Sequence, residues 1–136
     1  MRREDLNVLI KKTFEEVLSL STNKGHEYSG EDDALSNFKR NAERVGITPM
    51  QVWAVFAGKH YDSICTYIKE STGIKKRKLA EPIESRIDDL ITYLLLLKGL
   101  VYEKEGIEVG PHDAIEVDKQ YAPNYNELLQ KGVKGT

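Results

Sequence analysis

The segment from Glu81 to Leu97 constrains the fold most, because it joins a run of carboxylates to a strongly apolar helix. Proline is tolerated in a helix only within the first turn, so Pro82 predicts a helix that starts near Glu81. At about 100° per residue, polar and apolar side chains separate onto two faces. The polar face carries Glu81, Glu84, Asp88 and Thr92, and the apolar face carries Ile83, Ile87, Leu90, Ile91 and Leu94. From about Leu94 onward the helix is apolar on nearly every side, which predicts that it is buried.

Carboxylates that lead into a buried segment are costly unless they are solvated, paired or bound to a cation. Mg²⁺ prefers one or two carboxylates together with waters and substrate phosphates. The candidate magnesium ligands are therefore Glu81, Glu84, Asp88 and Asp89. Because Asp89 points about 100° away from Asp88, the two cannot face one ion without ligands from other segments, and Glu84 with Asp88 is the better pair. The alternative interpretation is a solvated acidic face that favours the helix dipole and pairs locally with Arg86.

Apolar residues at helical spacing predict a first helix over roughly residues 4–20, which stops before the polar stretch at Ser21. We predict a loop over Lys24–Gly30, because this stretch has two glycines and no periodicity. Glu31 or Asp32 can then cap a second helix.

Later helix ends are marked by glycine and proline. Gly46 closes the second helix, and Thr48 followed by Pro49 opens a third that runs towards Gly73. A basic connector, Lys75–Lys78, leads to the acidic helix, which ends at Gly106.

The chain is therefore expected to be an all-α, four-helix bundle-like single domain over residues 1–106. Residues 107–136 form a short irregular extension in this prediction, with one capping-box pattern at Asn124 and Glu127 for a last short helix. We expect the extension to pack on the bundle or on a neighbouring subunit.

Composition narrows the classes of partner. With 136 residues, 40% hydrophobic and 31% charged, the chain suits one soluble domain with a real core. A net charge of −2 argues against binding duplex nucleic acid or an anionic membrane. The single cysteine, Cys65, cannot form an internal disulfide, and the amino terminus has no signal-peptide pattern, so a cytoplasmic setting is expected. The longest apolar stretch, Leu90–Val101, is shorter than the roughly 20 residues that a membrane-spanning helix needs.

Lys59 and His60 lie in the middle of the third predicted helix. Lys59 is a candidate phosphate ligand, although a lysine on a solvated face is the alternative. A lone histidine is more often hydrogen-bonded at the edge of a core than placed in a site. The loop residues His26, Glu27, Asp32 and Asp33 offer further ligands or a base, but a simple polar turn explains them nearly as well.

Four motifs then occur in order: Lys24-Gly25-x-x-Tyr28, Asp33-Ala34-Leu35-x-Asn37-Phe38, Lys59-His60-x-Asp62-Ser63-Ile64, and Glu81-Pro82-Ile83 followed by Asp88-Asp89-Leu90-Ile91-x-Tyr93. Together they resemble the phage proteins called nucleotide modification associated domain 1, over roughly residues 20–100. The resemblance implies a role in nucleotide metabolism during infection, in the host cytoplasm. Within it, the expected nucleotide-binding residues are Lys24, Tyr28, Asn37, Lys59, His60 and Arg86.

More distantly, Asp89-Leu90-Ile91-x-Tyr93-Leu94 is similar to the second acidic helix of the all-α nucleoside triphosphate pyrophosphohydrolases, of the MazG and dimeric dUTPase kind. Those proteins are helical bundles, usually oligomeric, that hold magnesium with acidic residues from two helices and hydrolyse the α–β phosphate linkage. This similarity implies catalytic roles for Glu81 and Asp89. The pattern departs at two places: Glu15 and Glu16 are adjacent rather than three apart, and Arg86 stands where a glutamate is expected.

Three functions remain open. The first is a magnesium-dependent pyrophosphohydrolase, in which Lys59 or the basic connector holds phosphate and a metal-bound water attacks. The second is a non-catalytic protein that sequesters a nucleotide second messenger used in host defence, with aromatic side chains such as Tyr28 stacking on a base. The third is a structural module whose apolar Leu94–Val101 segment is an oligomer interface. A homo-oligomer is expected in all three.

Overall fold

A computed structural model describes residues 1–28, 33–72 and 81–110, with side chains for all of these except residues 22–28. Four helices occupy these ranges: α1 (Arg3–Tyr28), α2 (Ser36–Val45), α3 (Pro49–Ser71) and α4 (Ile83–Glu105). No strand occurs in the described part of the chain, so the predicted all-α class is confirmed. Within the same ranges, no helix is both long and apolar enough to span a lipid bilayer.

Local sequence signals set the ends of three helices. Gly46 and Gly106 close α2 and α4 in the left-handed conformation, with φ of 76° and 67°. Such φ values carry no steric penalty for glycine, which has no Cβ. At the start of α3, the Thr48 side chain accepts a hydrogen bond from the Gln51 backbone N–H, and the Gln51 side chain accepts one from Thr48. These signals confirm the predicted helix ends.

The predicted loop at Lys24–Gly30 is wrong over most of its length, because α1 continues to Tyr28. A glycine in a helix costs only about 1 kcal/mol, so Gly25 alone does not stop it. Helix α2 begins with Leu35 as its N-cap, and the side chain that bonds there is Asp33, which accepts the Leu35 backbone N–H at 2.9 Å.

Several predictions lie outside the described residues. They are the basic connector Lys75–Lys78 and the extension beyond residue 110 with its predicted last helix. The predicted cap of the second helix at Glu31 or Asp32 is wrong, because Leu35 is the N-cap of α2.

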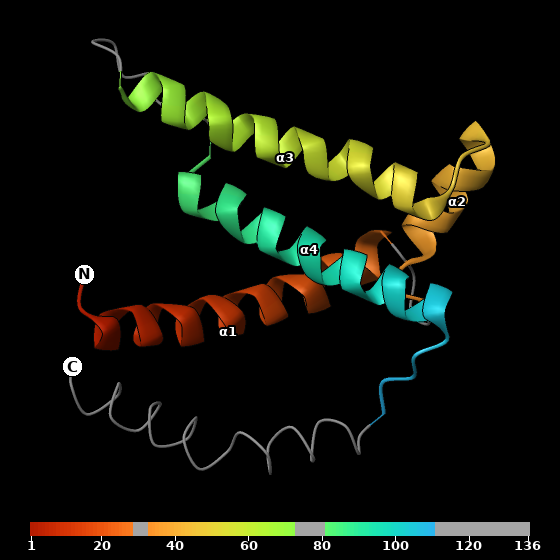
Figure 1. Cartoon of the computed structure of the whole chain (residues 1–136), viewed down its shortest axis with the longest axis horizontal. Helices are drawn as coiled ribbons and strands as arrows, with labels where there is room; N and C mark the ends of the chain where they lie inside the picture. The colour runs from red at the N-terminus through yellow and green to blue at the C-terminus, as the bar shows by residue number, and fades with distance from the viewer. Residues whose placement is uncertain (29–32, 73–80, 111–136) are drawn as a thin grey trace.

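Helix α4 is the centre of the fold (Figure 1), with α3 on one side and α1 on the other. Helix α3 runs antiparallel to α4, while α2 crosses at the amino-terminal end of α3. The buried core lies where α2 meets α3 and α4, and it consists of Leu35, Phe38, Ala42, Val52 and Leu100. Gly99 lies at this contact, and a Cβ on it would be 3.6 Å from a methyl of Leu35, an ordinary van der Waals distance.

The prediction that α4 is buried on nearly every side is wrong for the single chain. Leu94, Leu95 and Val101 are 52%, 46% and 38% exposed, and only Leu100 of this helix is buried. Among the described elements, the main contacts of α4 are with α3 and α1, so a third face is left open.

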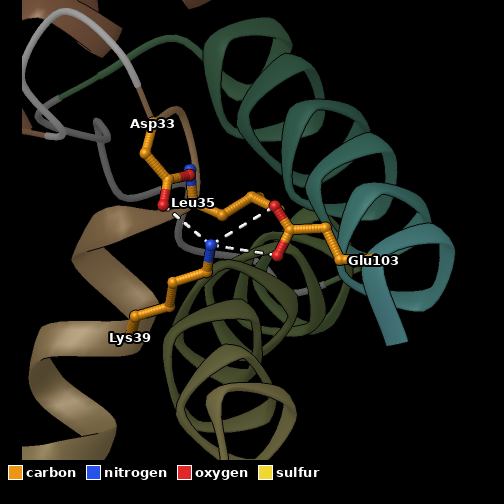
Figure 2. Close-up of polar contacts among 4 residues, drawn as sticks. All are labelled: Asp33, Leu35, Lys39 and Glu103. Carbon is orange, nitrogen blue, oxygen red and sulfur yellow. Dashed lines mark hydrogen bonds and ion pairs between the residues drawn. The ribbon is translucent and has the colours of Figure 1, made fainter. Parts of the chain in front are cut away.

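An ionic cluster ties α2 to α4 (Figure 2). The Lys39 ammonium lies 2.7 Å from an Asp33 carboxylate oxygen and 3.0 Å from Glu103 near the end of α4. The hydrogen bond from Lys39, followed by that from the Leu35 N–H, lowers the pKa of Asp33 below its ordinary 3.8. The cluster therefore orients α2 against the carboxyl-terminal end of α4.

Replacing Lys39 by methionine is expected to cost at most about 1 kcal/mol of unfolding free energy near pH 7, because these side chains are partly solvated. A lowered carboxyl pKa contributes stability above the ordinary value of 3.8 and loses it as the pH falls through the folded-state pKa. Urea unfolding should therefore show the Lys39→Met cost at neutral pH and little of it near pH 2. Lys69→Met, the same change at an exposed site of α3, is the control; an equal loss in both variants would contradict the prediction.

Candidate functional site

Asp88 and Asp89 are adjacent on α4 but face different helices. An Asp89 carboxylate oxygen lies 3.8 Å from Nδ1 of His60 on α3. Asp88 instead lies on the α1 side, where the negative charge of Glu16 acts on it. This division follows from the rotation of about 100° between consecutive helical residues.

The Asp88 carboxyl is in an unfavourable electrostatic environment. Burial is the main cause that raises its pKa, and the negative charges of Glu16, Asp89 and Glu84 raise it further. All of these effects disfavour the carboxylate form. A cation bound beside this half-buried carboxylate would reduce the repulsion from the neighbouring carboxylates.

Glu16 is a member of this cluster that sequence reasoning did not assign. It projects from α1 and pairs with Lys12 one turn away at 3.7 Å. The available signal was the expectation of glutamates on a first acidic helix, which Glu15 and Glu16 match only in part. Its position beside Asp88 depends on how α1 packs on α4.

His60 sits at the edge of the core. Its ring centroid is 4.7 Å from that of Tyr93, which in turn makes an edge contact with Phe38 at 6.1 Å. The Trp53 indole N–H donates to the backbone carbonyl of Tyr93. These contacts hold the imidazole in place, so that it presents Nδ1 towards Asp89.

Two buried polar atoms near this pair have no hydrogen-bond partner in the described part of the chain: Ser63 Oγ on α3 and Arg86 Nε on α4. Ser63 is one turn from His60, and Arg86 is one turn from Asp89. Both atoms have unused hydrogen-bonding capacity near the start of α4, where a bound anion would also meet the positive end of the helix dipole.

The other predicted site residues lie away from Asp88 and the His60–Asp89 pair, or have side chains that the structure does not describe. The Lys59 ammonium is 5.9 Å from the ring of Phe56 on its own helix. Asn37 accepts hydrogen bonds from Asn41 on α2. Glu81 is exposed just before α4. The side chains of Lys24 and Tyr28 are not among those described.

The structure thus places Glu84 and Asp88 of the predicted set near Glu16, which the sequence did not assign, and places Asp89 near His60, which was also predicted. In the described ranges, no three His, Cys, Asp or Glu side chains are grouped closely enough to hold a metal ion by themselves. Mg²⁺ commonly needs only one or two carboxylates, because waters and substrate phosphates complete its shell. Glu84 and Asp88, one turn apart on α4, supply two carboxylates for that arrangement.

Comparisons of the chain with protein-family models, with curated proteins and with solved structures find no match in any of the three.

Proposed function

We propose that the protein binds a nucleotide through its phosphates at the acidic face of α4, and that it is a magnesium-dependent nucleoside triphosphate pyrophosphohydrolase of phage nucleotide metabolism. The observation that carries this proposal is the position of the Asp88 carboxyl, which is half-buried on the α1 side of α4 with the carboxylates of Glu16, Asp89 and Glu84 near it. Such an arrangement lowers the stability of the folded chain, and a divalent cation held by these carboxylates would offset that cost.

Each side of α4 has a separate task in this proposal. Glu84 and Asp88, with Glu16 opposite, would hold Mg²⁺, which supplies charge neutralisation on the phosphates. Asp89, oriented by His60 at 3.8 Å, would accept the proton of the attacking water. Arg86 and Ser63 have buried donors with no hydrogen-bond partner among the described residues, and they would bind phosphate oxygens.

The test is a thermal-shift screen of the full chain against nucleoside mono-, di- and triphosphates, with and without Mg²⁺. A ligand that binds the native state raises the melting temperature by mass action. Any hit is then incubated with the protein and analysed by chromatography. Release of pyrophosphate with the monophosphate supports hydrolysis, whereas a panel with neither shift nor product would count against nucleotide binding altogether.

Replacing Asp88 by asparagine is expected to raise the melting temperature near pH 7 in the absence of metal. A carboxyl whose folded pKa is raised destabilises the fold above that pKa, and the penalty disappears below its ordinary value of 3.8. The gain from Asp88→Asn should therefore shrink as the pH approaches 3.8. Addition of Mg²⁺ should stabilise the wild type and leave Asp88→Asn nearly unchanged.

Asp62→Asn is the matched control, because Asp62 is an exposed carboxylate of α3. It should keep the Mg²⁺ response of the wild type and show no gain in metal-free buffer. An unchanged or lower melting temperature for Asp88→Asn would contradict the electrostatic argument.

A second function, non-catalytic sequestration of a nucleotide second messenger used in host defence, is favoured by the division of the carboxylates. Asp89 pairs with His60 and turns away from the Asp88 side, so the acidic residues that the pyrophosphohydrolase resemblance places at one metal are split between two faces. This function predicts tight binding without turnover. Intact ligand recovered after heat denaturation of the complex would support it, and a hydrolysed product would exclude it.

A further inference from the structure

Helix α4 carries a heptad stripe on the face that neither α1 nor α3 occupies. Its spacing alternates four and three residues, and its members are Ile83, Ile87, Leu90, Leu94, Leu97 and Val101. Ile87, Leu94 and Val101 form one set of heptad positions and are exposed, whereas the other set is half-buried. A repeat of 3.5 residues is the spacing that keeps an apolar seam facing a second helix.

Helix α3 carries a second stripe with the same alternation of four and three residues. Its members are Met50, Ala54, Ala57, Tyr61, Ile64 and Ile68. Again one set is exposed, with Tyr61 at 59% and Ile68 at 57%, while Ala57 and Ile64 of the other set are covered to a greater extent. Two neighbouring helices therefore repeat the same pattern of exposed and covered heptad positions.

Both stripes lie on the same side of the molecule. The line of contact between the helices is marked by His60 with Asp89 and by Trp53 with Tyr93. From that line, the stripe is displaced by about 60–80° on α3 and by about 80–120° on α4, in both helices in the direction of increasing residue number. Because α3 and α4 are antiparallel (Figure 1), rotations in this direction on the two helices lead to the same side.

The opposite side of α3 and α4 is closed by the rest of the described chain. Leu35, at the start of α2, packs at Gly99, which is about 160° around α4 from the centre of its stripe. Helix α1 lies beside Asp88, about 140° from that centre. The two stripes therefore form one continuous apolar surface, here called the dimer face, that no described element covers.

We propose that the dimer face binds the same face of a second copy of this chain, so that α3 and α4 of both copies make a four-helix bundle. A 23-residue helix is about 35 Å long, and two packed helices are about 20 Å wide, so the face offers roughly 700 Å² per partner. A stable interface buries about 800 Å² per partner.

Sedimentation equilibrium on the full chain should give twice the mass of one chain at micromolar concentration. Leu94→Glu and, independently, Tyr61→Glu should each weaken dimerisation by at least about 100-fold, since each would bury an unpaired carboxylate in both copies. Leu9→Glu is the matched control: Leu9 is 47% exposed on α1 against 52% for Leu94, and it should leave the dimer intact. Helical circular dichroism and Trp53 fluorescence confirm that each variant is folded.

Three results would overturn the proposal. The first is a wild-type chain that is monomeric at every concentration, as expected if another part of the chain covers the face. The second is a dimer that survives both Leu94→Glu and Tyr61→Glu, and the third is a dimer abolished by Leu9→Glu alone. None of these measurements requires a nucleotide, so they test the dimer face independently of the proposed activity.

Discussion

Replacing Phe38 by alanine is expected to lower the free energy of unfolding by about 3–5 kcal/mol. Phe38 is 3% exposed, and its ring lies 6.1 Å from those of Phe56 on α3 and Tyr93 on α4. Truncation would remove the side chain that joins α2 to both long helices and leave a cavity that the helices cannot readily fill. Because the stability of a domain is usually about 5–15 kcal/mol, this loss is a large fraction of the total.

Urea unfolding followed by Trp53 fluorescence measures the effect, since the indole packs against the same core. Phe14→Ala is the control, because it makes the same chemical change at a side chain of α1 that is 50% exposed. We expect the control to cost less than about 1 kcal/mol. Equal losses in the two variants would mean that the core is not centred on α2.

Replacing Asp89 by asparagine is expected to reduce nucleotide hydrolysis by at least about 100-fold, the usual range for loss of a group that transfers a proton. The amide keeps the size of the carboxylate and its place beside His60, but it cannot accept a proton from water. Nucleotide affinity should change much less than turnover, because the phosphate-binding donors of Arg86 and Ser63 are intact.

The measurement compares single-turnover rates and equilibrium binding for the wild type and Asp89→Asn. Asp62→Asn again serves as the control and should keep full activity. If Asp89→Asn loses binding and turnover to the same extent, the carboxylate has no separate catalytic role. If the wild type binds the nucleotide but shows no turnover, sequestration replaces hydrolysis as the function.

The helix ends that were predicted correctly depend on interactions within a few residues. Thr48 with Gln51 closes a capping box, and Gly46 and Gly106 take left-handed φ values, so sequence neighbours suffice to specify them. The predicted loop at Lys24–Gly30 was wrong because it also depended on a local signal. A glycine costs a helix only about 1 kcal/mol, which is too little to end it.

The burial of α4 could not be predicted from its own composition. A helix that is apolar on most sides is expected to be buried, but which sides are covered depends on the positions of α1, α2 and α3. In the single chain the dimer face stays open, with Leu94 half exposed. The composition of α4 is consistent instead with burial against a second copy.

For the candidate site, too, the sequence determined some features and the tertiary structure decided others. Periodicity determined the helices and the rotation of about 100° that separates Asp88 from Asp89, and local capping signals determined the ends at Gly46, Thr48 and Gly106. Only the tertiary structure decided that Asp88 meets Glu16 of α1 while Asp89 meets His60 of α3. The physical reason is range: helix periodicity and capping act over a few residues, whereas the partners of a carboxylate depend on packing between segments 29 and 72 positions apart in the chain.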